Sequence, residues 1–293
     1  MSRPRLRLLR AAALAVATAG VLLSSAPPAS AAVPTGRYVA LGDSYTSGPL
    51  IPTQVDLNCL RSNRNYPSLV AASARSSSFA DVSCSGATTD DILAGGDGPL
   101  GIPVPAQLSA VTSGTALVTV QIGGNDIGFS SIITTCAEGS LSSPLGSPCK
   151  DRYTAGGVDQ LQARIDATAP KITAVLRAVR AAAPNARIVV LGYPAILPDS
   201  GNGCWPVVPI AYRDVPYLRT VQKSLNAMLA ANAAANNATY VDVYTPSIGR
   251  DSCKSAGTRW VEGLIPLNAA APFHPNAAGE QGMATAVLAR LNG

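Results

Sequence analysis

The sequence has 293 residues and a single histidine, His274, and none of its cysteines form a C-x-x-C pair. Structural and catalytic zinc sites are built mainly from cysteine and histidine side chains. These two absences therefore leave little with which to hold a metal ion, and we expect no metal site.

Charged residues are also few, at 13%, and aromatic residues reach 5%, whereas 47% of the residues are hydrophobic. Such a composition argues against a disordered chain or a coiled coil. It supplies enough apolar material for one sizeable core. No run of basic residues follows the N-terminal segment, so we expect no nucleic-acid partner.

Residues 1–31 have the pattern of a secretory signal peptide. Four arginines precede an apolar stretch from Ala11 to Leu23, and Ala29-Ser30-Ala31 offers a cleavage site of small residues. The alternative is a membrane anchor, but this stretch is short for a span of about 20 residues. We therefore expect residues 32–293 to be a secreted, extracellular domain without a stable membrane anchor.

Removing that segment also changes the charge. The net charge of +5 includes four arginines and no acid from residues 1–31, so 18 basic and 17 acidic residues remain, a net of +1. Neither a repeat nor a low-complexity linker divides residues 32–293. One domain is the simplest interpretation, and we expect a monomer.

Six cysteines follow the predicted signal peptide. An even number in an exported protein favours disulfides over a metal site, and six cysteines allow 15 pairings. We expect sequential pairing, in which the disulfides are Cys59–Cys84, Cys136–Cys149 and Cys204–Cys253.

Short apolar runs alternate with helical patterns along the chain. The predicted strands are Tyr38–Leu41, a weaker one at Phe79–Ser83, Ala116–Ile122, Ile188–Leu191 and Thr239–Val243. The predicted helices are Leu161–Ala183, which Pro170 would bend or interrupt, Val221–Ala235, and Ala277–Leu291 with Asn276 as its N-cap. This alternation predicts an α/β fold with a parallel sheet covered on both faces.

Polar motifs follow several of these strands, where sites form in such sheets. Gly42-Asp43-Ser44 follows the first strand, and a serine in this place can project its hydroxyl into a cleft and offer its backbone N–H to an oxyanion. Taken alone, the motif fits an N-cap serine at least as well. Asp43 is adjacent to Ser44, so we interpret its side chain as a hydrogen-bonding brace for the loop.

Two further loops and the histidine complete the set of candidate residues. Asn125 and Asp126 follow Gly123-Gly124, and Asn125 can donate a side-chain N–H to an oxyanion, whereas Asp126 is interpreted as a second brace. Gly86 can offer a backbone N–H to the same cleft. Each loop alone is an ordinary turn. If Ser44 is a nucleophile it needs a base, and His274 is the only histidine available.

Together these motifs resemble the SGNH (GDSL) hydrolase family, in order and spacing, over nearly all of residues 32–293. The resemblance implies a flavodoxin-like three-layer α/β/α sandwich and ester-cleaving activity without a cofactor. It implies that Ser44 is the nucleophile and His274 the base. The oxyanion hole would consist of the backbone N–H groups of Ser44 and Gly86 and the side chain of Asn125. The cysteines and the predicted signal are closest to the secreted lipases and esterases of actinomycetes.

One position departs from the family pattern. The family usually carries Asp-x-x-His, and here Ala271 stands where the aspartate belongs. In a Ser-His-Asp triad the acid orients the imidazole. We therefore expect a Ser-His dyad in which a backbone carbonyl, that of Ala271 or Pro272, accepts the Nδ1 hydrogen. A distant acid, Asp242 or Asp251, is the alternative.

The substrate is less sharply defined. Lipid or acyl esters are the first expectation, and two long loops, 130–153 and 199–216, are candidates to line an acyl-chain groove. The alternatives are a phospholipase, a carbohydrate acetyl esterase and, from another class, a non-catalytic exported binding module. The missing aspartate is the one feature that favours a binding module.

Overall fold

The computed structural model describes Met1 and residues 34–292. Apart from Met1, the predicted signal peptide therefore lies outside the described residues. Within the described part of the chain, no helix has both the length and the apolar character needed to cross a membrane.

The core of residues 34–292 is a parallel sheet of five strands in the order β4-β1-β7-β8-β9. These strands confirm all five predicted ones, with ends shifted by at most two residues. The order reverses between β1 and β7, and clefts form at the carboxyl ends of the strands beside such a reversal. The strands are β1 (Arg37–Gly42), β4 (Ser78–Asp81), β7 (Thr115–Gln121), β8 (Arg187–Leu191) and β9 (Thr239–Val241).

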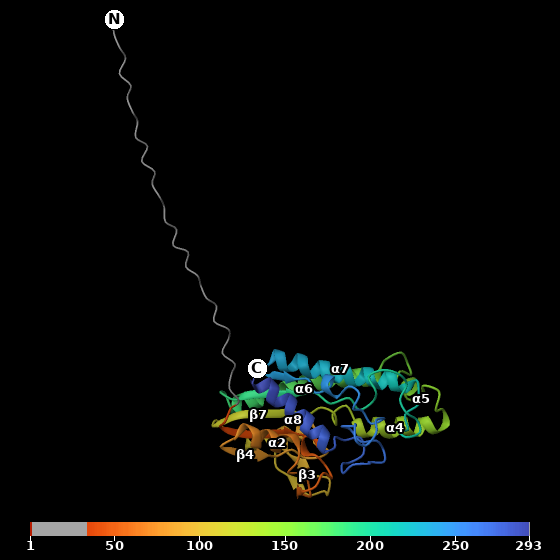
Figure 1. The fold of residues 1–293 in the computed structure, drawn as a ribbon, viewed down its shortest axis with the longest axis horizontal. Helices are drawn as coiled ribbons and strands as arrows, with labels where there is room; N and C mark the ends of the chain where they lie inside the picture. Colours follow the sequence, from red (N-terminus) through yellow and green to blue (C-terminus); the bar gives the residue numbers. More distant parts are fainter. Residues whose placement is uncertain (2–33, 293) are drawn as a thin grey trace. The chain divides into compact units, whose positions relative to one another are not determined.

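Helices cover both faces of this sheet (Figure 1). Side chains alternate along each strand, so Val39 and Leu41 of β1 pack on one side while Tyr38 and Ala40 pack on the other. The predicted α/β/α sandwich is thereby confirmed. One side is covered by α3 (Thr89–Ala94), α6 (Gln160–Ala182) and α7 (Asp214–Ala235), and the other by α2 (Tyr66–Ala74) and α8 (Ala277–Asn292).

The remaining elements are short apart from α4. They are α1 (Ser44–Ser47), α4 (Phe129–Ser142), α5 (Pro148–Tyr153), β2 (Gln54–Asp56), β3 (Arg61–Ser62), β5 (Gly96–Asp97), β6 (Pro103–Val104) and the 3-10 turns Gln107–Ala110 and Thr245–Ser247. Strands β2 and β3 form one hairpin-like pair, and β5 and β6 form another.

The helices differ from the expectations in three places. Pro170 does not interrupt α6, because its ring lies on the exposed face while the opposite face is buried along the whole helix. Helix α7 begins at Asp214 rather than Val221, since Val215 and Leu218 also pack into the core. The expected loop at 130–153 is mostly helical, as α4 and α5.

The cysteines form three disulfides between the sequentially paired residues. Cys136 of α4 is joined to Cys149 of α5, and the other two bonds are Cys59–Cys84 and Cys204–Cys253. Asn276 caps α8 as predicted, since its Oδ1 accepts the backbone N–H groups of Ala278 and Gly279.

Candidate active site

Ser44 lies directly beyond the carboxyl end of β1, as the first residue of α1. Asp43 caps this short helix, because its carboxylate accepts the backbone N–H of Tyr45 at 2.9 Å. Gly48 ends the helix in the left-handed region at φ +69°, a conformation that suits glycine. The tight turn holds Ser44 on the wall of a cleft, largely buried, with 8% of the residue exposed.

His274 faces Ser44 from the loop that precedes α8. Its Nε2 lies 2.8 Å from the Ser44 Oγ, and its Nδ1 lies 2.7 Å from the carbonyl oxygen of Pro272. A carbonyl oxygen only accepts hydrogen bonds, so Nδ1 carries the hydrogen and Nε2 is left free to accept the hydroxyl proton. The two residues thus have the geometry of a nucleophile and a general base.

The two candidate carbonyls have different roles. The carbonyl of Pro272 is the one that meets the imidazole, whereas that of Ala271 accepts the backbone N–H of His274 at 3.2 Å. Asp242 instead accepts N–H groups at the start of the turn 245–247, and Asp251 accepts that of Cys253. Among the described residues, no carboxylate is hydrogen-bonded to His274.

Burial lowers the pKa of His274 below its usual range, although the hydrogen bond to the Pro272 carbonyl acts in the opposite direction. The imidazole is therefore neutral at pH 7, the form in which it can accept a proton. The ring also lies against that of Tyr45, with centroids 5.1 Å apart. The Tyr45 hydroxyl donates to the carbonyl of Phe273 at 2.6 Å and so ties the histidine loop to α1.

The three expected oxyanion donors line the same open cleft as His274. No hydrogen bond within the described residues occupies the backbone N–H of Ser44 or that of Gly86. Asn125 uses one side-chain N–H to bind the carbonyl of Ala87 at 2.8 Å, which fixes the amide and leaves its second N–H available. The structure therefore places Ser44, Gly86, Asn125 and His274 around one cleft, and Asp242 and Asp251 outside it.

Both predicted braces hold neighbouring loops together. Asp43 accepts the hydroxyl of Tyr193 at 2.6 Å, and that hydroxyl accepts the backbone N–H of Gly124 at 2.9 Å. The loops of Ser44 and Asn125 are thus connected through one phenol. Asp126 accepts both the backbone N–H and the hydroxyl of Thr89 at the start of α3.

Sequence reasoning missed Tyr193 and the pocket beside it. Tyr193 follows the carboxyl end of β8, which is the position that had singled out the other motifs, but it carries no recognisable pattern of its own. Next to Ser44, it borders a pocket whose wall is almost entirely apolar. Helices α4 and α7 contribute Ile132, Ile133, Leu218, Val221 and Leu225 to that wall.

The site thus has two parts that meet at Ser44 and Asn125, an apolar pocket and a more open cleft with Gly86 and His274. Ester cleavage needs room for an acyl chain on one side of the carbonyl and for the alcohol on the other. Within residues 34–292, no group of three or more His, Cys, Asp or Glu side chains could hold a metal ion.

Comparison with known proteins shows similarity to one family of ester hydrolases. The sequence profile of the GDSL-like lipase/acylhydrolase family matches residues 40–281. Lipase 2 of Streptomyces coelicolor is 42% identical over 294 residues, which cover 97% of each chain. Two solved structures are also similar. Phospholipase A1 of Streptomyces albidoflavus NA297 has a TM-score of 0.71 at 32% identity, over 88% of this chain and 99% of its own. An extracellular lipase of Streptomyces rimosus has a TM-score of 0.70 at 33% identity, over 88% and 98%.

Proposed function

The chain belongs to the GDSL-like lipase/acylhydrolase family of carboxylic ester hydrolases, and from this we propose that it cleaves acyl esters through an acyl-enzyme on Ser44. The observation that carries the proposal is the continuous line of contacts from the Ser44 hydroxyl through the His274 imidazole to the Pro272 carbonyl, at 2.8 and 2.7 Å. A Ser-His dyad supported by backbone replaces the usual triad.

In the first half-reaction the Ser44 Oγ attacks the ester carbonyl carbon while His274 Nε2 takes its proton. Negative charge moves to the carbonyl oxygen, where the N–H groups of Ser44, Gly86 and Asn125 stabilise it. The protonated imidazole is stabilised by the Pro272 carbonyl at Nδ1 and then gives its Nε2 proton to the leaving alcohol. In the second half-reaction, water attacks the acyl-enzyme by the same route and releases the acid.

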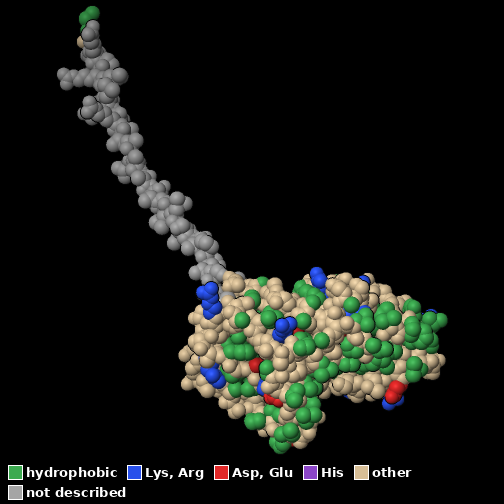
Figure 2. All heavy atoms as spheres, turned by 60° about the horizontal axis from the view of Figure 1, so that its bottom comes forward, with side chains coloured by type: hydrophobic (Ala, Val, Ile, Leu, Met, Phe, Trp, Pro, Cys, Tyr) green, Lys and Arg blue, Asp and Glu red, His purple; other side chains and the backbone are tan. Residues whose placement is uncertain are grey.

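The apolar pocket favours acyl chains longer than acetyl. Its wall offers a fatty acyl chain mainly hydrocarbon contacts, and an acetyl group would leave most of it unfilled. Large apolar side chains are also exposed on the surface, including Leu57, Leu100 and Ile265, which are 66%, 62% and 76% exposed. Figure 2 shows apolar side chains spread over much of one face, where charged groups are few. Lipid esters are the proposed substrate class.

A phospholipid is the second candidate within this class, because a similar solved structure is that of a phospholipase A1. Export to the extracellular space is part of the proposal. It is supported by the three disulfides, which form and persist in oxidising compartments, and by the extracellular lipase among the similar structures.

A series of p-nitrophenyl esters from acetate to palmitate tests the reaction and the chain length together. Wild type should cleave with an optimum beyond acetate, and Ser44→Ala should lose activity by at least about 10³-fold. Ser47→Ala is the matched control, since Ser47 is a buried serine of the same helix whose hydroxyl, within residues 34–292, is hydrogen-bonded only to that of Ser85. An acetate optimum would favour a carbohydrate acetyl esterase, and folded wild type without activity would favour a binding module. Phosphatidylcholine against triacylglycerol then separates the two lipid classes.

A further inference from the structure

The imidazole of His274 is oriented by its own loop. Its Nδ1 partner, the Pro272 carbonyl, lies only two residues earlier in the chain. In a triad, an aspartate side chain fixes the ring independently of the neighbouring backbone. Here, the position of the ring depends on how firmly the backbone of residues 271–276 is held.

A short antiparallel pair holds that backbone. The backbone N–H of Glu262 donates to the His274 carbonyl at 3.0 Å, and the N–H of Asn276 donates to the Trp260 carbonyl at 2.8 Å. Between these two bonds, Val261 and Pro275 form an isolated bridge. Residues 260–262 therefore form the supporting segment with which residues 274–276 are paired.

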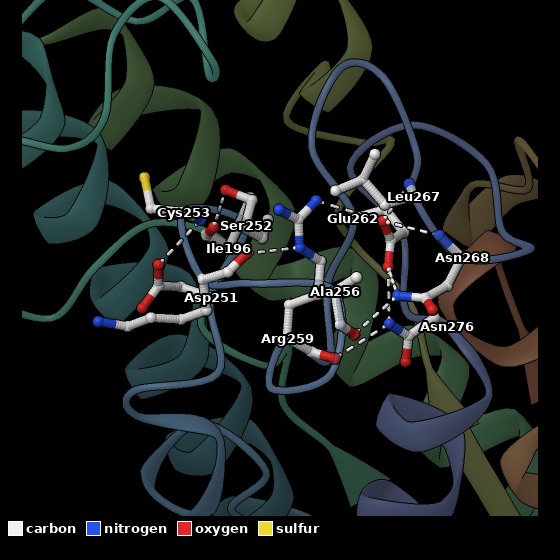
Figure 3. Close-up of polar contacts among 11 residues, drawn as sticks. Ile196, Asp251, Ser252, Cys253, Ala256, Arg259, Glu262, Leu267, Asn268 and Asn276 are labelled. Carbon is white, nitrogen blue, oxygen red and sulfur yellow. Dashed lines mark hydrogen bonds and ion pairs between the residues drawn. The ribbon is translucent and has the colours of Figure 1, made fainter.

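The side chain of Glu262 links this supporting segment to the surrounding loops by hydrogen bonds. It is fully buried, and Figure 3 shows it at the centre of a polar network. Its two oxygens accept hydrogen bonds from the Leu267 N–H at 2.8 Å, the Asn268 N–H at 3.3 Å, the Asn268 amide at 2.7 Å, the Asn276 amide at 2.7 Å and the Arg259 guanidinium at 3.3 Å. One carboxylate thus joins segments on both sides of His274.

The charge of Glu262 is compensated within the network. Arg259 is 4% exposed and also donates to the Lys254 carbonyl, so both members of the ion pair are buried and partnered. Burial opposes ionisation of Glu262, but the hydrogen bonds from Asn268 and Asn276 outweigh it and hold the pKa of the carboxyl below its ordinary value. A buried pair of this kind tolerates the loss of one partner poorly.

We infer that Glu262 is a positioning residue for His274, which holds the base through the backbone of its loop where a triad aspartate would hold it directly. The inference rests on the proposed function, in which His274 is the base. Glu262 touches neither the substrate cleft nor the reacting atoms. Its contribution is to keep the Nδ1 hydrogen of His274 aimed at Pro272 and Nε2 aimed at Ser44.

Glu262→Gln tests this at nearly constant volume. Whichever way the amide turns, one oxygen becomes an NH₂ group that faces N–H donors, so the network loses at least two of its bonds. The loop then loosens and His274 is slightly misplaced, and small misplacements of catalytic groups lower the rate of the chemical step. We therefore expect kcat on a soluble p-nitrophenyl ester to fall about 10- to 100-fold, with KM changed less than about threefold.

NMR of the imidazole gives a readout that does not need activity, because His274 is the only histidine. In ¹⁵N-histidine-labelled wild type we expect a single Nδ1–H tautomer. In Glu262→Gln we expect a mixture of tautomers and a pKa that moves up toward the ordinary 6.5, since burial is the larger of the two effects lost. Tyr45, whose ring lies against the imidazole, and Asp97, which lines the cleft, are unchanged in every variant, so neither accounts for a difference between them.

Asp214→Asn is the matched control. Asp214 is a fully buried carboxylate that accepts the backbone N–H groups of Cys149 and Lys150, away from the histidine loop. This variant should lose stability yet keep the wild-type tautomer, imidazole pKa and kcat. If Glu262→Gln does not fold, Asn268→Ala removes one donor to Glu262 and should change the same quantities less.

The outcomes separate the inference from the proposed function. A folded Glu262→Gln or Asn268→Ala protein with the wild-type tautomer and imidazole pKa would overturn the positioning role, whatever its activity. The opposite result is also possible. If wild type shows the single tautomer, Glu262→Gln loses it, and wild type cleaves no ester, then the positioning role stands and the proposed reaction is overturned.

Discussion

Asp43 makes the protein's stability depend on pH in a way that can be worked out from the structure. Its carboxyl is 1% exposed, and burial raises its pKa to about 7 despite hydrogen bonds from Tyr193 and Tyr45. In the unfolded chain the pKa is near 3.8. Between about pH 4 and pH 7 the folded protein therefore binds more protons at this site than the unfolded chain does. The free energy of unfolding consequently falls as pH rises through this window.

The size of the effect follows from the shift. About three pKa units, at about 1.4 kcal/mol each, correspond to about 4 kcal/mol of stability lost at this site by pH 8. Asp43→Asn removes the titration but keeps an oxygen that can accept the Tyr45 N–H. Relative to wild type, the variant should therefore gain about 4 kcal/mol between pH 4 and pH 8.

Urea unfolding of both proteins at several pH values, with the disulfides intact, measures this difference. The buried acids Asp81 and Glu280, whose pKa values burial also raises, are shared by both proteins, so their contributions cancel. A difference between wild type and Asp43→Asn that stays constant within about 1 kcal/mol from pH 4 to 8 would refute the reasoning.

Three further predictions concern the reaction. Asn125→Ala removes one oxyanion donor and should lower kcat about 10²- to 10³-fold with little change in KM; an unchanged kcat would exclude the donor role. Because burial lowers the pKa of His274, the acid limb of kcat/KM of wild type should have its midpoint below pH 6.5; a midpoint above 6.5 would contradict this. Val221→Phe narrows the apolar pocket and should shift the chain-length optimum of the ester series toward shorter chains, with the acetate rate preserved; an unchanged profile would place the acyl chain elsewhere.

The central strands β1, β7 and β8 could be predicted because they are short, apolar and buried on both faces, a pattern that owes little to distant contacts. The helices were less predictable where tertiary packing decides. Helix α4 contains Gly139 and several serines and threonines with weak helix propensity, and it is nevertheless helical, joined to α5 by a disulfide. Pro170 shows the same dominance of packing over local preference within α6.

In the candidate site, too, local motifs could be read from the sequence, whereas contacts that depend on tertiary packing could not. Ser44, Asn125 and His274 stand in motifs whose order and spacing resemble those of the SGNH (GDSL) family, so their approach to one another could be anticipated from that resemblance. The choice of Pro272 over Ala271 depends on how a single loop is folded, which no local pattern specifies. Contacts of long sequence separation, such as Tyr193 to Asp43, leave no periodic signal either.

Labelling with a fluorophosphonate, followed by peptide mass spectrometry, tests most directly that Ser44 is the nucleophile. The account predicts one adduct per chain, on the peptide that contains Ser44, and labelling of His274→Ala slower by at least about 10³-fold. An adduct on another serine, or persistent ester hydrolysis by a chain that the reagent does not modify, would contradict the central claim.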